Sequence, residues 1–424
     1  MTLALGILAA CGDEDVILPG ERFDLRPAPA FINETRDVAL PQAIANADWT
    51  HRNGGPSHQI THPALGATLS SVFVADIGEG DSRRARITSE PVIAGGVVYT
   101  VDARATVTAT TTSGETLWRR SAVSGLDNPS DASGGAVSVG NGQVFVTTGF
   151  GEIIAMNAAD GEVQWVQDLD APVTTGATVN GDLVYLVSRD STAWALETDT
   201  GRIRWQRTGT PSDANFGGGA SPAVAGNFAI FPFPSGEIAA TYPTGGLSRW
   251  STVVSGDRLG RAASLINDIA GDPVIAGNRV YIANFGGRTV ALDLEDGSRI
   301  WTAAEGALGP VWPVGDAVFL INDVNELVRL DAQDGTPVWR GDLPKFDEGR
   351  NTVRQRSVFA HYGPVLAGGR LIVASSDDVI RQFDPASGAA LETLELPGGA
   401  ASAPAVAGET LYVISKRGQL HAFR

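Results

Sequence analysis

A glycine followed four residues later by a tryptophan recurs along this chain at intervals of roughly 40–50 residues. A turn-forming residue precedes most of these glycines, as in Asp160-Gly161, and such pairs supply the positive φ that tight hairpins need. A second hairpin pattern lies upstream in each unit, for example at 224–231 and 275–282. Each unit is therefore predicted to contain four strands. The recurring pairs are Gly114/Trp118, Gly161/Trp165, Gly201/Trp205, Gly246/Trp250, Gly297/Trp301 and Gly335/Trp339.

Four-stranded units of this length predict an all-β propeller, whereas β-sandwich domains need about 100 residues each. Six units end in Trp, and a seventh carries Glu392 at the expected Trp position. An eighth unit stops at Ala422-Phe423, before its last strand. We expect the segment around Trp49 to supply that strand and close the ring, because closure removes an open sheet edge. The prediction is an eight-bladed propeller over residues 45–424, with seven blades as the alternative.

Two sets of repeated residues are expected to be structural. The tryptophans are predicted to pack between neighbouring blades, since a buried Trp covers about 200 Å². The acidic residues Asp293, Asp296, Asp331 and Asp334 stand where hairpin turns favour Asp. We therefore expect these carboxylates to stabilise turns and to take no part in catalysis.

The N-terminus resembles a lipoprotein signal. Residues 3–10 are apolar, and this stretch is too short to cross a bilayer as a helix but matches the apolar core of a secretory signal. Leu8-Ala9-Ala10-Cys11 resembles the bacterial lipobox, and Cys11 is the one cysteine of the chain. We expect residues 1–11 to be the signal remnant with lipidation at Cys11, and the Pro-containing residues 12–44 to form a flexible tether. The alternative is a short apolar start with a chance cysteine.

The repeat, written Ala-Leu-Asp…Asp-Gly…Trp, resembles that of the pyrroloquinoline quinone (PQQ) proteins, a propeller repeat similar in architecture to WD40 repeats. Quinoprotein dehydrogenases carry it, and so does the BamB family of outer-membrane lipoproteins. The combination of Cys11, a tether, Trp49 followed by Gly54-Gly55, and eight repeats resembles the BamB family over nearly the whole chain.

This resemblance implies a non-catalytic, palmitate-bearing lipoprotein on the periplasmic face of the cell outer membrane. It implies a scaffold that binds a POTRA domain of BamA and other subunits of the β-barrel assembly (BAM) complex, and that assists insertion of unfolded outer-membrane proteins. The lipid anchor would be its only membrane attachment. The formal charge of −17 argues against a nucleic-acid partner, because phosphate contacts require clustered Lys and Arg.

Two other functions remain as alternatives. A PQQ-dependent dehydrogenase would, by resemblance, use a pair of adjacent cysteines and bound Ca²⁺, but this chain has one cysteine. An envelope propeller could also bind another ligand, such as peptidoglycan or a sugar. His51, His58 and His62 lie close together, but no Cys or acid falls at ligand spacing beside them, so we predict neither metal nor cofactor.

Two long connections are the predicted partner-binding site. They span residues 206–219 and 251–272, and the family resemblance places the BamA contact on them. Asp268-Ile269 matches an acid followed by a β-branched residue in the family, and Phe216 matches an apolar position, although Gly217 stands where well-known members have Arg. We expect Asp268→Arg to weaken BamA binding and leave folding intact. The predicted contact residues are Asn215, Phe216, Gly217, Asn267, Asp268 and Ile269.

Overall fold

The structure, a computed structural model, describes residues 31–125, 127–128, 134–173, 175–212, 219–256, 258, 268–346 and 358–424. Cys11 and residues 12–30 of the expected tether lie outside this range. The chain divides into two units, Met1–Ile32 and Asn33–Arg424, and the fold below is that of the second. None of the described helices is long and apolar enough to span a membrane.

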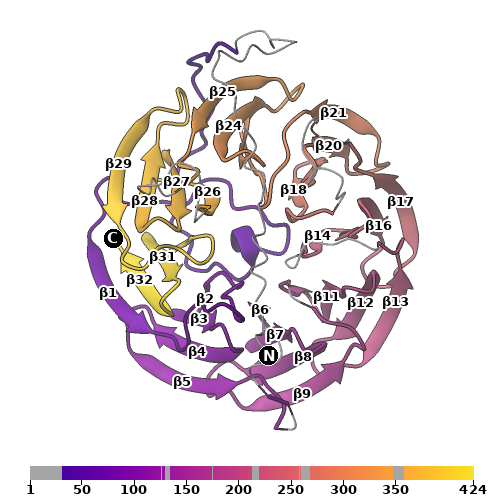
Figure 1. Ribbon diagram of the computed structural model, residues 1–424. Helices are drawn as coiled ribbons and strands as arrows, with labels where there is room; N and C mark the ends of the chain where they lie inside the picture. Colours follow the sequence, from indigo (N-terminus) through magenta and orange to yellow (C-terminus); the bar gives the residue numbers. More distant parts are fainter. Residues whose placement is uncertain are drawn as a thin grey trace, which may run out of the picture. The chain divides into compact units, whose positions relative to one another are not determined.

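Eight antiparallel sheets of four strands each form the blades of a propeller, which confirms the predicted eight blades (Figure 1). Blades 1 to 4 contain β2 (Val92–Ala94), β3 (Val97–Val101), β4 (Thr106–Thr111) and β5 (Thr116–Ser121); β6 (Gly135–Gly140), β7 (Gln143–Thr148), β8 (Glu152–Asn157) and β9 (Val163–Asp168); β10 (Thr178–Asn180), β11 (Leu183–Val187), β12 (Thr192–Glu197) and β13 (Ile203–Thr208); and β14 (Ala223–Ala225), β15 (Phe228–Pro232), β16 (Glu237–Thr241) and β17 (Ser248–Val253).

Blades 5 to 8 complete the ring. They contain β18 (Val274–Ala276), β19 (Arg279–Ala283), β20 (Thr289–Asp293) and β21 (Arg299–Ala303); β22 (Trp312–Val314), β23 (Ala317–Ile321), β24 (Glu326–Asp331) and β25 (Pro337–Asp342); β26 (His361–Ala367), β27 (Arg370–Ser375), β28 (Val379–Phe383) and β29 (Ala390–Glu395); and β30 (Ala405–Ala407), β31 (Thr410–Ser415) and β32 (Gln419–Phe423), with β1 (Ser71–Asp76) as the outermost strand of blade 8.

The repeat tryptophans pack between neighbouring blades, as predicted, and each also contacts a turn glycine of the next blade. Trp250 of blade 4 donates its indole N–H to the Leu294 carbonyl of blade 5 at 2.9 Å. A Cβ added to Gly297, in the same turn of blade 5, would lie 2.6 Å from the Trp250 ring. Only glycine fits at this contact, so the Gly and Trp of the repeat form one inter-blade joint. The same joint recurs at Gly161/Trp118, Gly201/Trp165, Gly246/Trp205, Gly335/Trp301 and Gly388/Trp339.

The repeated acidic residues stabilise turns, as expected. Asp293 accepts a hydrogen bond from the Glu295 backbone N–H at 2.8 Å, and Asp296 accepts one from Ser298 at 2.8 Å. Hydrogen bonds from Ser298 lower the pKa of Asp296. These side chains therefore hold the backbone in its turn conformation. Asp331 and Asp334 make the equivalent bonds in blade 6.

The strand that closes the ring is β1, not the segment around Trp49. β1 pairs antiparallel with β32, and Phe73 lies opposite Ala422 as each Trp of blades 1 to 5 lies opposite an Ala. The Phe73 ring packs on Tyr412 with centroids 6.5 Å apart. Phe73 therefore occupies in blade 8 the position that Trp occupies in blades 1 to 5. No Trp stands there, which is why the prediction chose Trp49 and was wrong.

Blade 7 lacks an aromatic residue at the Trp position for a related reason. Glu392 was predicted to stand at the Trp position, and the next residue, Thr393, lies opposite Arg381. The neighbouring blade 8 has no turn between its two outer strands, because β32 and β1 come from opposite ends of the unit. There is consequently no turn glycine for a Trp of blade 7 to pack against.

Residues 46–63, here called the plug, cross the centre of the ring and include the 3₁₀ turn η1 (Arg52–Gly54) (Figure 1). Consecutive parts of the plug accept a backbone N–H from the innermost strand of each of blades 1 to 5. The bonds are Ile93 to the Trp49 carbonyl, Val139 to Thr50, Val179 to the His51 ring, Val224 to Pro56 and Ile275 to Ser57, at 2.7–3.0 Å. Blades 7 and 8 bond to it through Gly368 and Gly408.

Residues 33–44, here called the strap, were expected to be part of the flexible tether. They belong instead to the same unit as the propeller. The Glu34 backbone N–H donates to the Val338 carbonyl at 2.9 Å, and Arg36 pairs with Asp331 at 2.7 Å. Ala39 donates to Asp316 at 3.0 Å, which ties the strap to blade 6. In that blade Pro313 stands where the inner strands of blades 1 to 5 offer an N–H to the plug. Plug and strap together contact all eight blades.

Candidate partner-binding face

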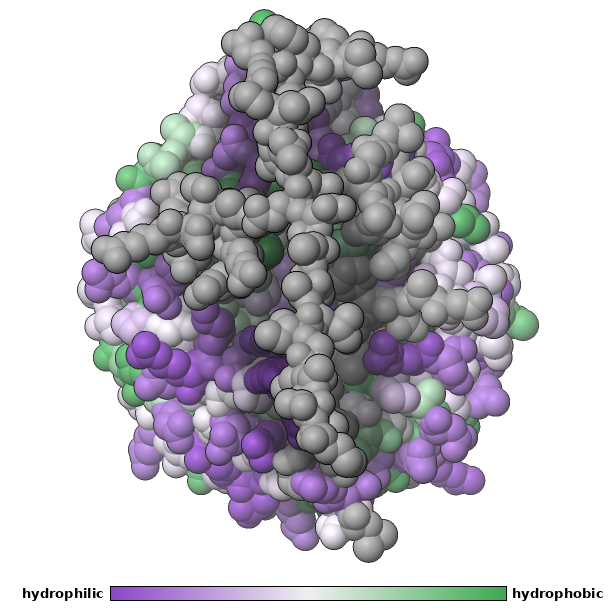
Figure 2. Space-filling model, viewed as in Figure 1, coloured by the Kyte–Doolittle hydropathy of each residue, from purple (hydrophilic) through white to green (hydrophobic). Residues whose placement is uncertain are grey.

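The described ends of the two predicted partner-binding connections lie on one face of the propeller. Each runs from the outermost strand of one blade to the innermost strand of the next, and in a four-stranded meander all such connections leave from the same side. We call this side the connection face. Figure 2 shows mostly hydrophilic residues on the described surface visible in that view, with scattered hydrophobic ones. Asn215, Phe216, Gly217 and Asn267 lie outside the described residues.

Asp268 and Ile269 are described, and both are buried. Each has 1% of its surface exposed, and Ile269 belongs to the apolar core that includes Trp250 and Ile275. The Asp268 carbonyl accepts the backbone N–H of Phe285 at 3.0 Å. Both side chains border a recess of about 30 Å³ that Arg189 and Pro234 also line. This burial conflicts with the expectation that Asp268→Arg leaves folding intact, because a larger charged side chain has no space there.

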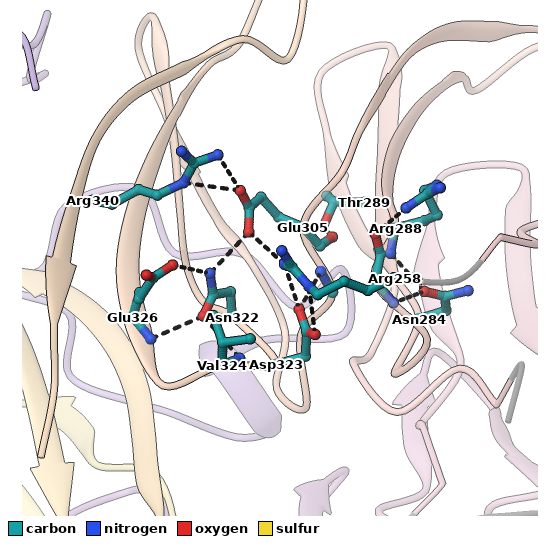
Figure 3. Close-up of polar contacts among 12 residues, drawn as sticks. Arg258, Asn284, Arg288, Thr289, Glu305, Asn322, Asp323, Val324, Glu326 and Arg340 are labelled. Atoms are coloured by element: carbon teal, nitrogen blue, oxygen red, sulfur yellow. Dashed lines mark hydrogen bonds and ion pairs between the residues drawn. The ribbon is translucent and has the colours of Figure 1, made fainter. Parts of the chain in front are cut away.

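Arg258 fixes the other end of the connection between blades 4 and 5. Its guanidinium donates two hydrogen bonds of 2.9 Å to Asp323 and one of 3.0 Å to Glu305 (Figure 3). Desolvation lowers the pKa of Arg258, but the hydrogen bonds and charges of Asp323 and Glu305 outweigh it and raise the pKa. The carboxylates come from blades 5 and 6, so this one side chain ties the connection to the two following blades.

Glu305 is the centre of this cluster. Its side chain is 1% exposed, and one oxygen accepts from Arg340 at 3.0 and 2.5 Å while the other accepts from Arg258 and Asn322 (Figure 3). The Arg340 backbone also exchanges two hydrogen bonds with the Asn33 side chain of the strap. A buried carboxylate between two guanidiniums is satisfied and rigid. Sequence reasoning missed this cluster because its members lie far apart in the chain and follow no repeat spacing.

The three clustered histidines serve the plug. The His51 ring accepts the Val179 N–H at 2.9 Å, and desolvation followed by the charge of His58 lowers the pKa of His51 to about 3. The His58 Nδ1 bonds to the Pro273 carbonyl at 2.9 Å. His62 bonds to the Pro41 carbonyl and to the Gly369 N–H. Across the described ranges, no group of three or more His, Cys, Asp or Glu could hold a metal ion.

Comparison with known proteins identifies the family. The family model for "Outer membrane protein assembly factor BamB" matches residues 103–341 and 329–424. A protein of that name from Burkholderia pseudomallei is 24% identical over 361 residues, which cover 84% of this chain and 88% of that protein. Another from Moranella endobia is 26% identical over 200 residues, and there the match spans about half of either protein, 46% of this chain and 51% of the relative.

Solved structures share the fold. The crystal structure of BamB from Moraxella catarrhalis superposes with a TM-score of 0.66 at 18% identity, covering 84% of this chain and 98% of that one. Quinohemoprotein alcohol dehydrogenase from Comamonas testosteroni superposes with a TM-score of 0.68 at 14% identity, covering 90% and 81%. The propeller is thus common to assembly factors and enzymes, and the fold alone does not separate them. The family model matches well over half of the sequence, and the chain belongs to the family of the outer membrane protein assembly factor BamB.

Proposed function

We propose that this protein is a non-catalytic scaffold of the machinery that assembles β-barrel proteins in the outer membrane. Its family membership and the names of its relatives support this function. It would bind BamA through a POTRA domain, act beside the other BAM subunits, and help deliver unfolded outer-membrane proteins. Lipidation at Cys11 would hold it on the periplasmic face of the outer membrane, with no other membrane attachment.

The partner would dock on the connection face, at residues 206–219 and 251–272. The observation that carries this proposal is the way the second connection is held. Arg258 is clamped by Asp323 and Glu305 at one end, and Asp268 and Ile269 are buried at the other. A segment whose two ends are fixed loses less conformational entropy on binding a partner than a segment of the same length with free ends. Asp268 and Ile269 would then position the adjacent contact residue Asn267, while Asn215, Phe216 and Gly217 would contact the partner from the first connection.

A binding titration with purified BamA tests this surface. The variant Phe216→Ala/Asn267→Ala removes two predicted contacts without touching Asp268. We expect its dissociation constant for BamA to rise at least tenfold, since an aromatic interface anchor typically contributes more than 1 kcal/mol. Circular dichroism of each variant checks that the fold is retained.

Leu247→Ala provides the matched control. Leu247 is 71% exposed and precedes β17 in a turn on the opposite face of the propeller. Its substitution should leave the BamA affinity unchanged. Equal affinities for the wild type and the double variant would remove these connections from the interface.

A further inference from the structure

A cavity of about 130 Å³, lined by both polar and apolar residues, lies at the centre of the ring, on the connection-face side of the plug. His51, Arg52 and His58 of the plug form its floor. Its walls come from residues just before or at the innermost strands of neighbouring blades, including 88–90 before β2 and 175–177 before β10. One water needs about 10–15 Å³, so the cavity has room for a group larger than a single water.

Buried hydrogen-bond acceptors without a partner gather at this cavity. Glu90 Oε1 accepts from Arg52 at 2.8 Å, but Glu90 Oε2 is unpaired among the described residues. His58 donates through Nδ1 to a carbonyl, and desolvation lowers its pKa, so the neutral ring presents Nε2 as an unpaired acceptor. Glu90 and His58 are 7% and 1% exposed. An unpaired buried polar atom costs about 1–3 kcal/mol, which a donor placed in the cavity would recover.

Three hydroxyl groups extend the same lining. Ser138, Thr175 and Ser221 come from blades 2, 3 and 4, and each hydroxyl is buried without a partner among the described residues. A hydroxyl can accept as well as donate a hydrogen bond. The lining therefore offers free acceptors at Glu90 and His58 together with three free hydroxyl groups that can turn to accept a hydrogen bond.

The charges around the cavity also favour a positively charged ligand. Arg52 pairs with both Glu90 and Asp272, at 2.8 and 3.2 Å, so one positive charge faces two carboxylates. Asp272 Oδ2 is a further buried oxygen without a partner among the described residues. Burial raises the pKa of Glu90 even though Arg52 opposes this shift. A second cation beside Glu90 would stabilise its ionised form.

We propose that this cavity binds a primary ammonium or guanidinium group, supplied by a small amine or by a Lys or Arg side chain of an extended polypeptide. Either group brings several N–H donors and one positive charge. The proposal does not depend on BamA binding, because the site and its test involve the full chain alone.

Calorimetric titration of the full chain with matched probes tests the proposal. The free probes are n-butylammonium, n-butylguanidinium and neutral 1-butanol. The peptide probes are Gly-Gly-Lys-Gly-Gly and Gly-Gly-Gln-Gly-Gly, both amidated at the C-terminus and acetylated at the N-terminus. We expect saturable binding of the cations and none of the neutral probes. Binding of the Lys peptide alone would assign the site to a side chain, and binding of the free cations alone would assign it to a small amine.

Glu90→Gln keeps the shape of the side chain and removes its charge, and should weaken cation binding at least tenfold. Glu295→Gln is the control for net charge, because Glu295 is an exposed carboxylate paired with Arg249 outside the cavity. It should leave binding unchanged. If Glu90→Gln does not fold, Thr175→Val removes one lining hydroxyl at constant shape and should weaken binding several-fold. Any of three results would overturn the proposal. These are no saturable binding of the cations, equal binding of the neutral probes, or equal losses of binding in Glu90→Gln and Glu295→Gln.

Discussion

Trp49 of the plug stacks on Trp312 of blade 6, with ring centroids 6.2 Å apart and planes inclined by 19°. The Trp49 backbone exchanges two hydrogen bonds with Ile93 of blade 1. Trp49 has no exposed surface, and Trp312 has 2%. One residue of the plug thus connects two blades that are not neighbours in the ring. The plug therefore acts as a central brace, beyond the contacts between adjacent blades.

Removing this brace should destabilise the whole propeller. We expect Trp49→Ala to lower the free energy of unfolding by about 3–5 kcal/mol, the usual loss for a buried Trp. Urea unfolding followed by circular dichroism measures the change. Leu247→Ala, at an exposed position, should change the unfolding free energy by less than about 0.5 kcal/mol. Similar losses in the two variants would show that Trp49 has no bracing role.

The inter-blade joint can be tested with two glycines of the same blade. Gly277 and Gly297 have φ angles of 61° and 73°, but an added Cβ meets nothing within 4 Å at Gly277 and lies 2.6 Å from Trp250 at Gly297. Gly277→Ala should cost about 1–2 kcal/mol from backbone strain alone. Gly297→Ala should cost roughly 1–3 kcal/mol more, because it forces the Trp250 ring to move. Equal urea midpoints for the two variants would contradict this joint.

His51 should make the stability depend on pH. Its pKa is about 3 in the folded protein and about 6.5 when unfolded, so the unfolded chain binds more protons between these values. Stability is then complete above about pH 6.5 and falls as the pH is lowered, with a loss of roughly 2 kcal/mol at pH 5. His51→Gln keeps an acceptor for the Val179 N–H and should flatten this dependence. Urea unfolding from pH 4.5 to 7.5 measures it, and unchanged slopes would exclude His51 as the cause.

The Arg258 cluster should stabilise the connection between blades 4 and 5. Arg258→Leu leaves Asp323 and Glu305 without the cation between them, at side-chain exposures of 4% and 1%. We expect a loss of about 1–3 kcal/mol in unfolding free energy, together with weaker BamA binding. Arg204→Leu is the control, because Arg204 is 58% exposed and 3.9 Å from Glu197, and such surface pairs contribute little. If Arg258→Leu lost stability but kept its full affinity for BamA, the cluster would have no role in partner binding.

The repeating part of this fold could be predicted from the sequence because it is local. Turn residues and apolar strands recur within each unit, and each of the six repeat tryptophans has the same relationship to the Gly of the following blade. Phe73 could have been found as well, since Val72, Phe73, Val74 and Ala75 form a short apolar run before the first complete unit, which is typical of a strand. The prediction followed the identity of Trp49 instead of this apolar run.

The centre of the ring could not be predicted in the same way. The plug bonds to blades 1–5, 7 and 8 through residues that follow no repeat, as when the His51 ring accepts the Val179 N–H across 128 residues. The strap follows no hydrophobic period, so its proline and its charged residues resemble a tether. Asp268 was expected at the surface because of its match to a contact residue of the family, and its burial depends on the fold around it.

Affinity purification of the protein from detergent-extracted membranes, followed by mass spectrometry of its partners, tests the central claim most directly. A scaffold of the outer-membrane assembly machinery should retain BamA and the other BAM subunits, and Phe216→Ala/Asn267→Ala should lose them while Leu247→Ala retains them. Recovery of the wild-type protein alone, or with unrelated envelope proteins, would contradict the proposed function.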